Sequence, residues 1–185
     1  NFRLKPESID FSETSFSPKE KFKRNVHAIQ TLLKIEQENR YATAEEQEIM
    51  SKYVGWGGIS DAFDQNKQAW SDEYALLKSL LPETEYNSAR ESVLTAYYTA
   101  PCIIHFIFKV LDKLGFEKGN ILEPAVGIGK FFSLLPDKMQ DSKLYGVELD
   151  SLSGRIAKQL YPNADIQICG FEKANFSNDF FDVAI

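Results

Sequence analysis

Two patterns of apolar and polar positions divide the chain near residue 95. Before that point, apolar residues recur every three or four positions, as at Val26, Ile29 and Leu32, and this spacing predicts amphipathic helices. After it, short apolar runs alternate with further helical segments, which predicts an α/β fold with a parallel, doubly wound sheet. The predicted strands lie at residues 120–123, 143–148, 165–169 and 181–185. We therefore expect a helical N-terminal extension over residues 1–95 and a sheet domain over residues 96–185.

Local signals mark where several helices begin. Ser17 and Glu20 flank Pro18 in a capping box, and Thr43 and Glu46 form a second box. Each such cap stabilises its helix by roughly 1 kcal/mol. Further helices are predicted near residues 71–81, 84–94, 99–114, 130–135 and 151–160.

A glycine-rich segment, Tyr53-Val-Gly-Trp-Gly-Gly58, ends the second predicted helix. Its Trp56 has three interpretations: a lid over a ligand, a platform for a nucleic-acid base, or a packed turn. The packed turn is favoured, because a large aromatic residue between glycines usually serves the core.

Composition and charge narrow the class of protein. The chain has 185 residues and a net charge of −6, so it lacks the basic footprint of a domain that grips nucleic acid alone. Two cysteines and two histidines supply neither a disulfide framework nor a four-ligand zinc site. Since no apolar run approaches the roughly 20 residues of a membrane helix, we expect a cytoplasmic protein without a metal or membrane partner.

The first predicted strand runs into the turn Glu123-Pro-Ala-Val-Gly127-Ile-Gly129-Lys-Phe131. A glycine-rich turn between a strand and a helix lets a ligand approach the backbone. A dinucleotide site would need a third glycine where Phe132 stands, and a P-loop would need Ser or Thr in place of Phe131. A tight turn without a ligand remains the alternative. We expect this strand in the middle of the sheet, between the strand of Glu148 and the last strand.

Acidic and aromatic residues follow the next two strands. Glu148 lies about 20 residues past the glycines, where an acidic side chain holds a ribose diol in nucleoside-binding α/β folds. Phe171 and Glu172, after the third strand, could bind a purine ring. The alternatives are a solvated strand end for Glu148, a core position for Phe171 and a solvent-facing Glu172. Asp150 is read as a helix cap or loop acid.

These residues resemble a known family. The segments Tyr97-Tyr-Thr99-Ala-Pro101, Glu123 to Phe131, Gly146-Val-Glu148 and Phe181-Asp-Val-Ala-Ile185 look like the S-adenosylmethionine half of adenine-specific amino DNA methyltransferases of the gamma group. The resemblance covers residues 95–185. The whole chain further resembles the methylase segment of large helicase–methylase proteins of bacterial mobile elements.

The resemblance implies a Rossmann-like methyltransferase fold with S-adenosylmethionine as cofactor. Thr99 would contact the methionine end of the cofactor, Glu123 its amino group and Glu148 its ribose. Gly127 and Gly129 would present backbone groups to the methionine end of the cofactor. The implied cofactor-binding residues are Tyr98, Thr99, Glu123, Pro124, Ala125, Gly127, Gly129, Phe131, Glu148, Leu149, Phe171 and Glu172. The order Phe171-Glu172 departs from the family's Asp-Phe pair, which leaves their roles at the adenine open.

The implied activity is methylation of the adenine amino group in DNA. The family's catalytic Asn/Asp-Pro-Pro-Tyr/Phe motif would follow Ile185, so we expect this chain to bind the cofactor without transferring methyl. We expect the nucleic acid, DNA rather than RNA, to be gripped by parts beyond residue 185. The sheet edge after the last strand could allow self-association. The alternatives are an RNA or protein-glutamine methyltransferase, or a non-catalytic scaffold that keeps only the fold.

Overall fold

The computed structural model describes residues 1–4, 16–94 and 98–185. The chain forms two compact units. The described part of the helical unit is residues 16–94 and 98, and that of the sheet unit is residues 1–4 and 99–185. The predicted boundary between residues 95 and 96 falls outside the described residues.

Residues 1–4 differ from the expectation, because they belong to the sheet unit rather than to the helical extension. The Phe2 N–H donates to the Leu160 carbonyl at 2.7 Å, and the Leu4 N–H donates to the Ser133 carbonyl at 3.2 Å. The Phe2 side chain is buried. Backbone bonds and apolar burial thus tie this first segment to residues far along the chain.

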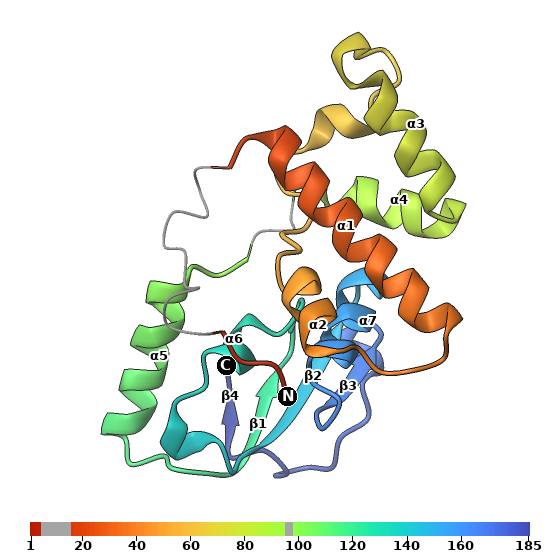
Figure 1. Cartoon of the computed structure of the whole chain (residues 1–185). Coiled ribbons are helices and arrows are strands. Elements are labelled where there is room, and N and C mark those ends of the chain that lie inside the picture. The colour runs from red at the N-terminus through yellow and green to blue at the C-terminus, as the bar shows by residue number, and fades with distance from the viewer. Residues whose placement is uncertain (5–15, 95–97) are drawn as a thin grey trace. The chain divides into compact units, whose positions relative to one another are not determined.

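The helical unit forms where the capping signals predicted it (Figure 1). Its α-helices are α1 (Pro18–Gln37), α2 (Ala44–Met50), α3 (Ser71–Leu80) and α4 (Glu83–Glu91). Short 3-10 helices lie at η3 (Ser60–Phe63), η4 (Gln68–Trp70) and η5 (Ser92–Leu94). Both predicted capping boxes are confirmed, since Glu20 and Glu46 each accept the backbone N–H of their cap residue, at 2.8 and 2.9 Å.

Trp56 lies in the aromatic core of the helical unit. It is 1% exposed and meets the rings of Phe22, Tyr53 and Phe63 edge to face, with centroids 5.3 to 6.4 Å apart. Buried Asn25 holds the turn beside it, because its amide donates to the Gly55 carbonyl and its oxygen accepts from the backbone at residue 54. The packed-turn interpretation of Trp56 is confirmed.

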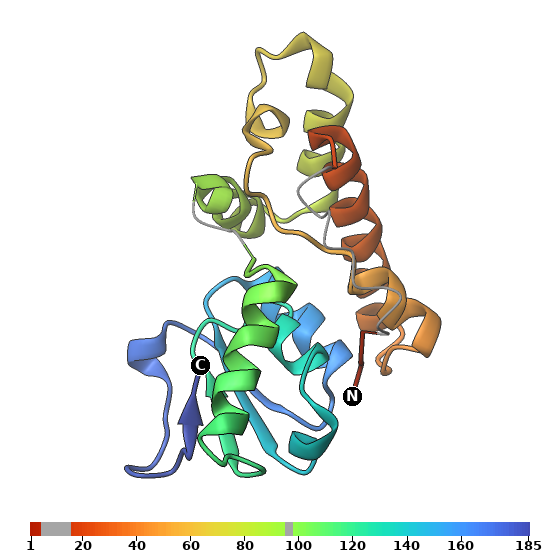
Figure 2. The same cartoon turned by 90° about the vertical axis from the view of Figure 1, so that its left-hand side faces the viewer.

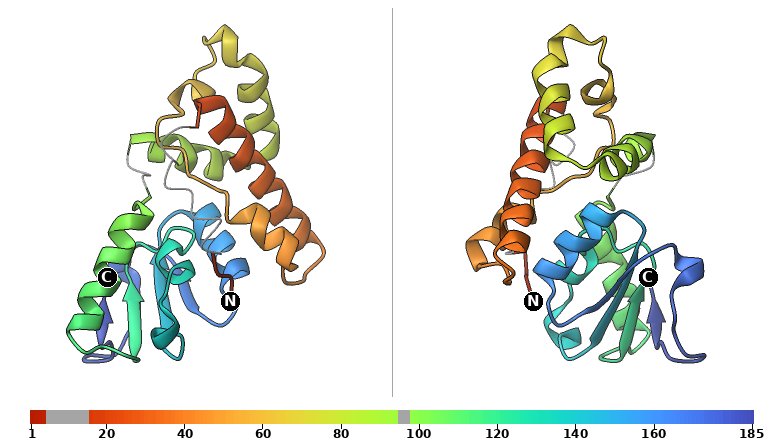
Figure 3. Two further views of the ribbon diagram at one scale, coloured as in Figure 1. Left: turned by 60° about the vertical axis from the view of Figure 1, so that its left-hand side comes forward. Right: turned by 90° about the vertical axis from the view of Figure 1, so that its right-hand side faces the viewer.

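The sheet unit contains four parallel strands (Figure 3). They are β1 (Asn120–Glu123), β2 (Lys143–Glu148), β3 (Asp165–Ile168) and β4 (Val183–Ala184). Their order across the sheet is β3-β2-β1-β4, which matches the first four strands of the Rossmann order. The predicted α/β class and the central position of β1 between β2 and β4 are confirmed.

The helices of the sheet unit are α5 (Pro101–Lys113), α6 (Lys130–Ser133) and α7 (Ser151–Leu160). Two 3-10 helices accompany them, η6 (Asp137–Met139) and η7 (Phe171–Lys173). Helix α5 runs beside the sheet (Figure 2), and its Phe108 meets Phe131 of α6 edge to face. Gly154 allows α7 to lie close to β3, because a side-chain carbon there would approach Ile168 within 2.8 Å.

Several elements are shorter than predicted, among them two strands and α6. β4 has two residues instead of five, β3 ends one residue early, and α6 ends at Ser133 instead of residue 135. The Asp182 and Ile185 N–H groups still donate to carbonyls of β1, so the ladder continues past the ends of β4. The early end of α6 follows from Pro136, which cannot continue a helix.

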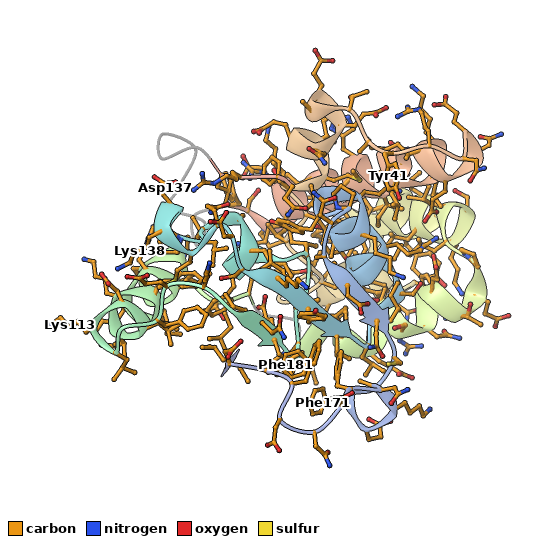
Figure 4. The ribbon with its side chains drawn as sticks, turned by 90° about the horizontal axis from the view of Figure 1, so that it is seen from below. Tyr41, Lys113, Asp137, Lys138, Phe171 and Phe181 are labelled. Carbon is orange, nitrogen blue, oxygen red and sulfur yellow. The ribbon has the colours of Figure 1, made fainter. Side chains whose placement is uncertain are left out.

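The outer surface of the sheet unit is held by ion pairs. Asp137 pairs with Arg3 at 2.8 Å, and Lys138 pairs with Asp112 of α5. Figure 4 shows Asp137 and Lys138 at the margin of this unit, with Lys113 on α5 nearby. These pairs link η6 to the N-terminal segment and to α5. Among the described helices, none has the length and apolarity needed to span a membrane.

Candidate functional site

The carboxyl ends of β1, β2 and β3 bring together most of the predicted site residues. Because parallel strands end at the same edge of a sheet, the loops after them gather there. β1 ends at Glu123, and the glycine turn follows it. β2 ends at Glu148, and β3 leads through Gly170 into η7. The described residues contain no cluster of three His, Cys, Asp or Glu side chains that could hold a metal ion.

The glycine turn after β1 is fixed by backbone bonds and by left-handed conformations. The φ angles of Gly127 and Gly129 are 54° and 83°, which glycine adopts without strain. The Val126 N–H donates to the Val147 carbonyl at 3.0 Å, and the Gly129 N–H donates to the Val126 carbonyl at 2.7 Å. The turn is therefore tied to β2 before any ligand is considered.

Gly129 packs tightly against Tyr161. A side-chain carbon at Gly129 would overlap the Tyr161 ring, and the Tyr161 hydroxyl donates to the Gly129 carbonyl at 2.8 Å. The same carbonyl accepts the Ser133 N–H. Burial raises the pKa of Tyr161, so its hydroxyl stays a donor. The backbone groups of Gly129 are thus engaged within the fold, while Gly127 is half-exposed at the surface of the turn.

Glu148 connects the glycine turn to α7. Its two carboxylate oxygens accept the Gly127 N–H at 2.6 Å and the Asp150 N–H at 2.8 Å. Burial raises the pKa of Glu148, and these two backbone donors oppose that rise. Asp150 caps α7 by accepting the Ser153 N–H at 2.9 Å, which confirms its predicted role as a helix cap. The carboxylate of Glu148 keeps lone pairs for further donors.

Glu123 is the most unusual group at this edge. Its side chain is buried, and its Oε2 atom has no hydrogen-bond partner among residues 1–4, 16–94 and 98–185. Burial, and then the nearby Glu148 carboxylate, raise the pKa of Glu123 well above its usual value. An unpartnered buried carboxylate is costly, so this position is suited to a cationic or hydrogen-bond-donating ligand.

The loops after β2 and β3 expose apolar side chains at this edge of the sheet. Leu149 is 77% exposed, and Phe171, labelled in Figure 4, is 53% exposed. Glu172 is also exposed, and its carboxylate turns back against the backbone at Gly170. The alternative of a core position for Phe171 is wrong, because its side chain is exposed. The alternative of a solvent-facing Glu172 agrees with its exposed side chain.

The remaining predicted residues lie in different settings. Pro124 and Ala125 are exposed in the turn, whereas Phe131 is buried against α5. Thr99 is half-exposed just before α5 in the sheet unit. Tyr98 is half-exposed and belongs to the helical unit.

Sequence reasoning missed the supporting role of two residues. Tyr161 fills the space beside Gly129, and Gly146 on β2 leaves room for Val126, which a side-chain carbon would meet at 2.9 Å. Tyr161 lies 32 residues from Gly129 and no local pattern pairs them. A glycine within an apolar strand, as at Gly146, is the one available signal of close approach.

Comparison with known proteins gives two similarities. The chain is 28% identical over 142 residues to the "Defense against restriction protein B" of Escherichia phage P1, and the match covers 76% of this chain and 5% of that protein. The chain thus spans about one twentieth of the length of this relative. A solved structure, of a putative class I S-adenosylmethionine-dependent methyltransferase from Listeria monocytogenes, is similar with 15% identity and a TM-score of 0.39. That similarity covers 89% of this chain and 58% of the other. No protein-family model matches.

Proposed function

We propose that this chain binds S-adenosylmethionine at the carboxyl edge of its sheet and serves as the cofactor-binding part of a methyltransferase. The observation that carries the proposal is the buried Glu123 carboxylate, which has an unpartnered oxygen beside Glu148 and the glycine turn. S-adenosylmethionine offers an ammonium group, a sulfonium, a ribose diol and an adenine ring. The residues at this edge match those groups in chemistry.

Glu123 fits the cationic end of the cofactor. An ammonium group at Oε2 would give the carboxylate its missing donor and favour its charged form. The same cation would screen the repulsion between Glu123 and Glu148, which raises the pKa of Glu123 in the absence of a ligand. Binding of a cation at this site is therefore expected to lower the raised pKa of Glu123 and to favour loss of its proton.

Glu148 fits the ribose. Its oxygens already accept the Gly127 and Asp150 N–H groups, and this fixes the carboxylate in place for the hydroxyls. The exposed side chains of Leu149 and Phe171 supply apolar surface for the adenine ring. Glu148 thus positions the loop and binds the diol with the same carboxylate.

We extend the proposal to the reaction of the parent protein, methylation of the adenine amino group in DNA. The resemblance of residues 97–101 and 123–131 to the motifs of adenine-specific amino methyltransferases supports this extension. The name of the phage P1 relative refers to defence against restriction, which favours DNA over RNA or protein as the substrate. When bound, the cofactor supplies a methyl group already activated on sulfur. This chain holds no Asn/Asp-Pro-Pro-Tyr/Phe segment, so for the chain alone the proposal is binding without transfer.

Calorimetric titration with S-adenosylmethionine tests the cofactor site. We expect the unmodified chain to bind, and Glu123→Gln to weaken binding at least about tenfold, because a charge-assisted hydrogen bond contributes roughly 1.5–3 kcal/mol. The matched control is Glu117→Gln, which changes an exposed carboxylate in the same unit and should bind normally. No binding by the unmodified chain, or equal binding by Glu123→Gln, would contradict the proposal.

A separate assay tests whether the chain transfers a methyl group to DNA. Adenine-containing DNA is incubated with the chain and cofactor labelled in its methyl group. We expect no label in the DNA, and robust labelling would overturn the prediction that this chain only binds.

A further inference from the structure

The helical unit contains a cavity of about 590 Å³ that the proposed cofactor site does not use. This volume lies within the roughly 300–1,000 Å³ typical of small-ligand pockets. The cavity is formed by the loop after η3 and by one face each of α3 and α4. Its lining includes Phe63, Asp64, Tyr74, Lys78, Tyr86 and Arg90.

Aromatic rings form the inner wall of this cavity. Phe63 and Tyr86 are buried, with centroids 5.5 Å apart, and the Tyr74 ring stands perpendicular to Tyr86 at 6.4 Å. Tyr74 is half-exposed, so part of its ring is open to a ligand. Burial raises the pKa of Tyr86, which keeps its hydroxyl protonated at neutral pH. This wall offers apolar, flat surface to a planar ring.

Two cations stand at the rim. Lys78 and Arg90 are exposed, and neither forms an ion pair with an acidic side chain in the described part of the chain. The Lys78 ammonium lies 3.9 Å from the centre of the Tyr86 ring, which holds the cation beside the aromatic wall. Asp64 is the acidic residue in the lining, and its Oδ1 accepts the Asn66 N–H at 2.9 Å. The rim therefore has positive charge to offer an anion.

We infer that this cavity binds a nucleoside phosphate, either as a free nucleotide or as one unit of single-stranded nucleic acid. The base lies against the Tyr74 ring, and Lys78 and Arg90 bind the phosphate. The side-chain amides of Gln65 and Asn87 offer donors and acceptors to the edge of the base. A carboxylate ligand of similar size would use the cations but leave these amides and the ring unused.

Charge and shape favour an unpaired nucleotide over a duplex. Acidic residues outnumber basic ones in residues 16–94, so this unit has no broad basic surface to follow a double helix. A base enters a cavity of this size only when its faces are free of neighbouring base pairs. Lys78 and Arg90 line the same cavity, so both cations are available to one phosphate.

Fluorescence anisotropy with a fluorescein-labelled, 12-nucleotide single-stranded DNA tests this inference on the full chain. We expect Lys78→Gln and Arg90→Gln each to weaken binding about tenfold, as for loss of a charged hydrogen bond. Tyr74→Leu should weaken it about fivefold or more through lost stacking. Lys52→Gln is the matched control, since Lys52 is exposed, pairs with Glu48 and lies outside the cavity. Lys78→Arg should retain binding, which separates loss of charge from loss of folding.

Further measurements show whether the ligand is a free nucleotide or a nucleic-acid strand. They also distinguish binding at this cavity from binding at the proposed cofactor site. Displacement of the labelled strand by adenosine monophosphate would identify a free nucleotide as the ligand, and resistance to millimolar competitor would identify the strand. Glu123→Gln should bind the strand normally, so failure here and failure of cofactor binding are distinguishable. The inference would be overturned if neither strand nor nucleotide bound, or if a double-stranded DNA of the same length bound equally well. Equal loss of affinity in Lys52→Gln and in the cavity variants would also overturn it.

Discussion

Two buried polar side chains, Asn25 in the helical unit and Glu123 at the carboxyl edge of the sheet, differ in how their hydrogen-bonding groups are satisfied. In the helical unit, both ends of the buried Asn25 amide are engaged, by the Gly55 carbonyl and the Val54 N–H. At the sheet edge, the buried Glu123 carboxylate keeps an oxygen without a described partner. Among the residues that the structure describes, Trp56 Nε1 also has no hydrogen-bond partner, but a neutral N–H costs far less to bury than a carboxylate does.

The contrast separates a structural group from one that we propose binds a ligand. Asn25 stabilises a turn, and its hydrogen bonds are complete in the folded chain. Burial of the Glu123 carboxylate costs the fold electrostatic free energy. We propose that a bound ligand offsets this cost. The predictions below test each side of this comparison.

The largest expected effect lies in the aromatic core of the helical unit. Trp56→Ala should lower the free energy of unfolding by about 3–5 kcal/mol, because it leaves a large cavity among buried rings. Urea unfolding followed by circular dichroism measures the change. Tyr41→Ala is the control, since Tyr41 is 71% exposed and should change stability by less than about 0.5 kcal/mol. Similar values for both variants would contradict the packed role of Trp56.

Gly129→Ala should destabilise the sheet unit by about 2–4 kcal/mol, through left-handed strain and overlap with the Tyr161 ring. Gly115→Ala measures the cost of the left-handed backbone without the overlap. Gly115 has nearly the same φ of 84° but nothing within 4 Å of a new side-chain carbon. We expect the Gly115 variant to lose about half as much or less in a thermal unfolding experiment. Equal losses would show that contact with Tyr161 does not matter.

Glu123→Gln should stabilise the chain at neutral pH while weakening cofactor binding. The folded pKa of Glu123 is raised, so the folded state holds a proton that the unfolded state releases above about pH 4. The unmodified chain therefore loses stability as pH rises toward the folded pKa, and the variant does not. The difference in unfolding free energy, measured from pH 4 to pH 8, should start near zero and grow.

Glu148→Gln should lower the stability of the chain at neutral pH, whereas Glu123→Gln should raise it. The two variants are therefore compared directly. An amide nitrogen cannot accept the Gly127 or Asp150 N–H, so the variant should be less stable by about 1–3 kcal/mol. If Glu123→Gln were as destabilising as Glu148→Gln, Glu123 would be a structural group and the comparison would fail.

The smallest expected effect is at a helix cap. Thr43→Ala should cost about 1 kcal/mol, because the Glu46 N–H at the start of α2 loses its side-chain acceptor. Thr84→Ala within α4 is the control and should change stability by less than about 0.5 kcal/mol. Urea midpoints provide the measurement, and equal shifts would argue that the capping box contributes little.

How far the sequence predicts this molecule depends on how local each determinant is. The capping boxes join residues three positions apart, so the starts of α1 and α2 were predictable. The central place of β1 followed from the glycine turn and from alternation of strands and helices. The contact of Tyr161 with Gly129 and the unpartnered oxygen of Glu123 depend on tertiary packing, which no local spacing encodes. The cavity at Lys78 and Arg90 was missed for the same reason.

The N-terminal segment has a consequence for the order of folding during synthesis. Phe2 and Leu4 are synthesised before the helical unit, whereas their acceptors at Leu160 and Ser133 are synthesised after it. The helical unit can therefore complete its core while these first residues have no partner. Closing so long a loop adds only slowly to the entropic cost, so the delay affects timing more than final stability. This segment therefore waits for residues on the far side of the helical unit before it can form its backbone hydrogen bonds.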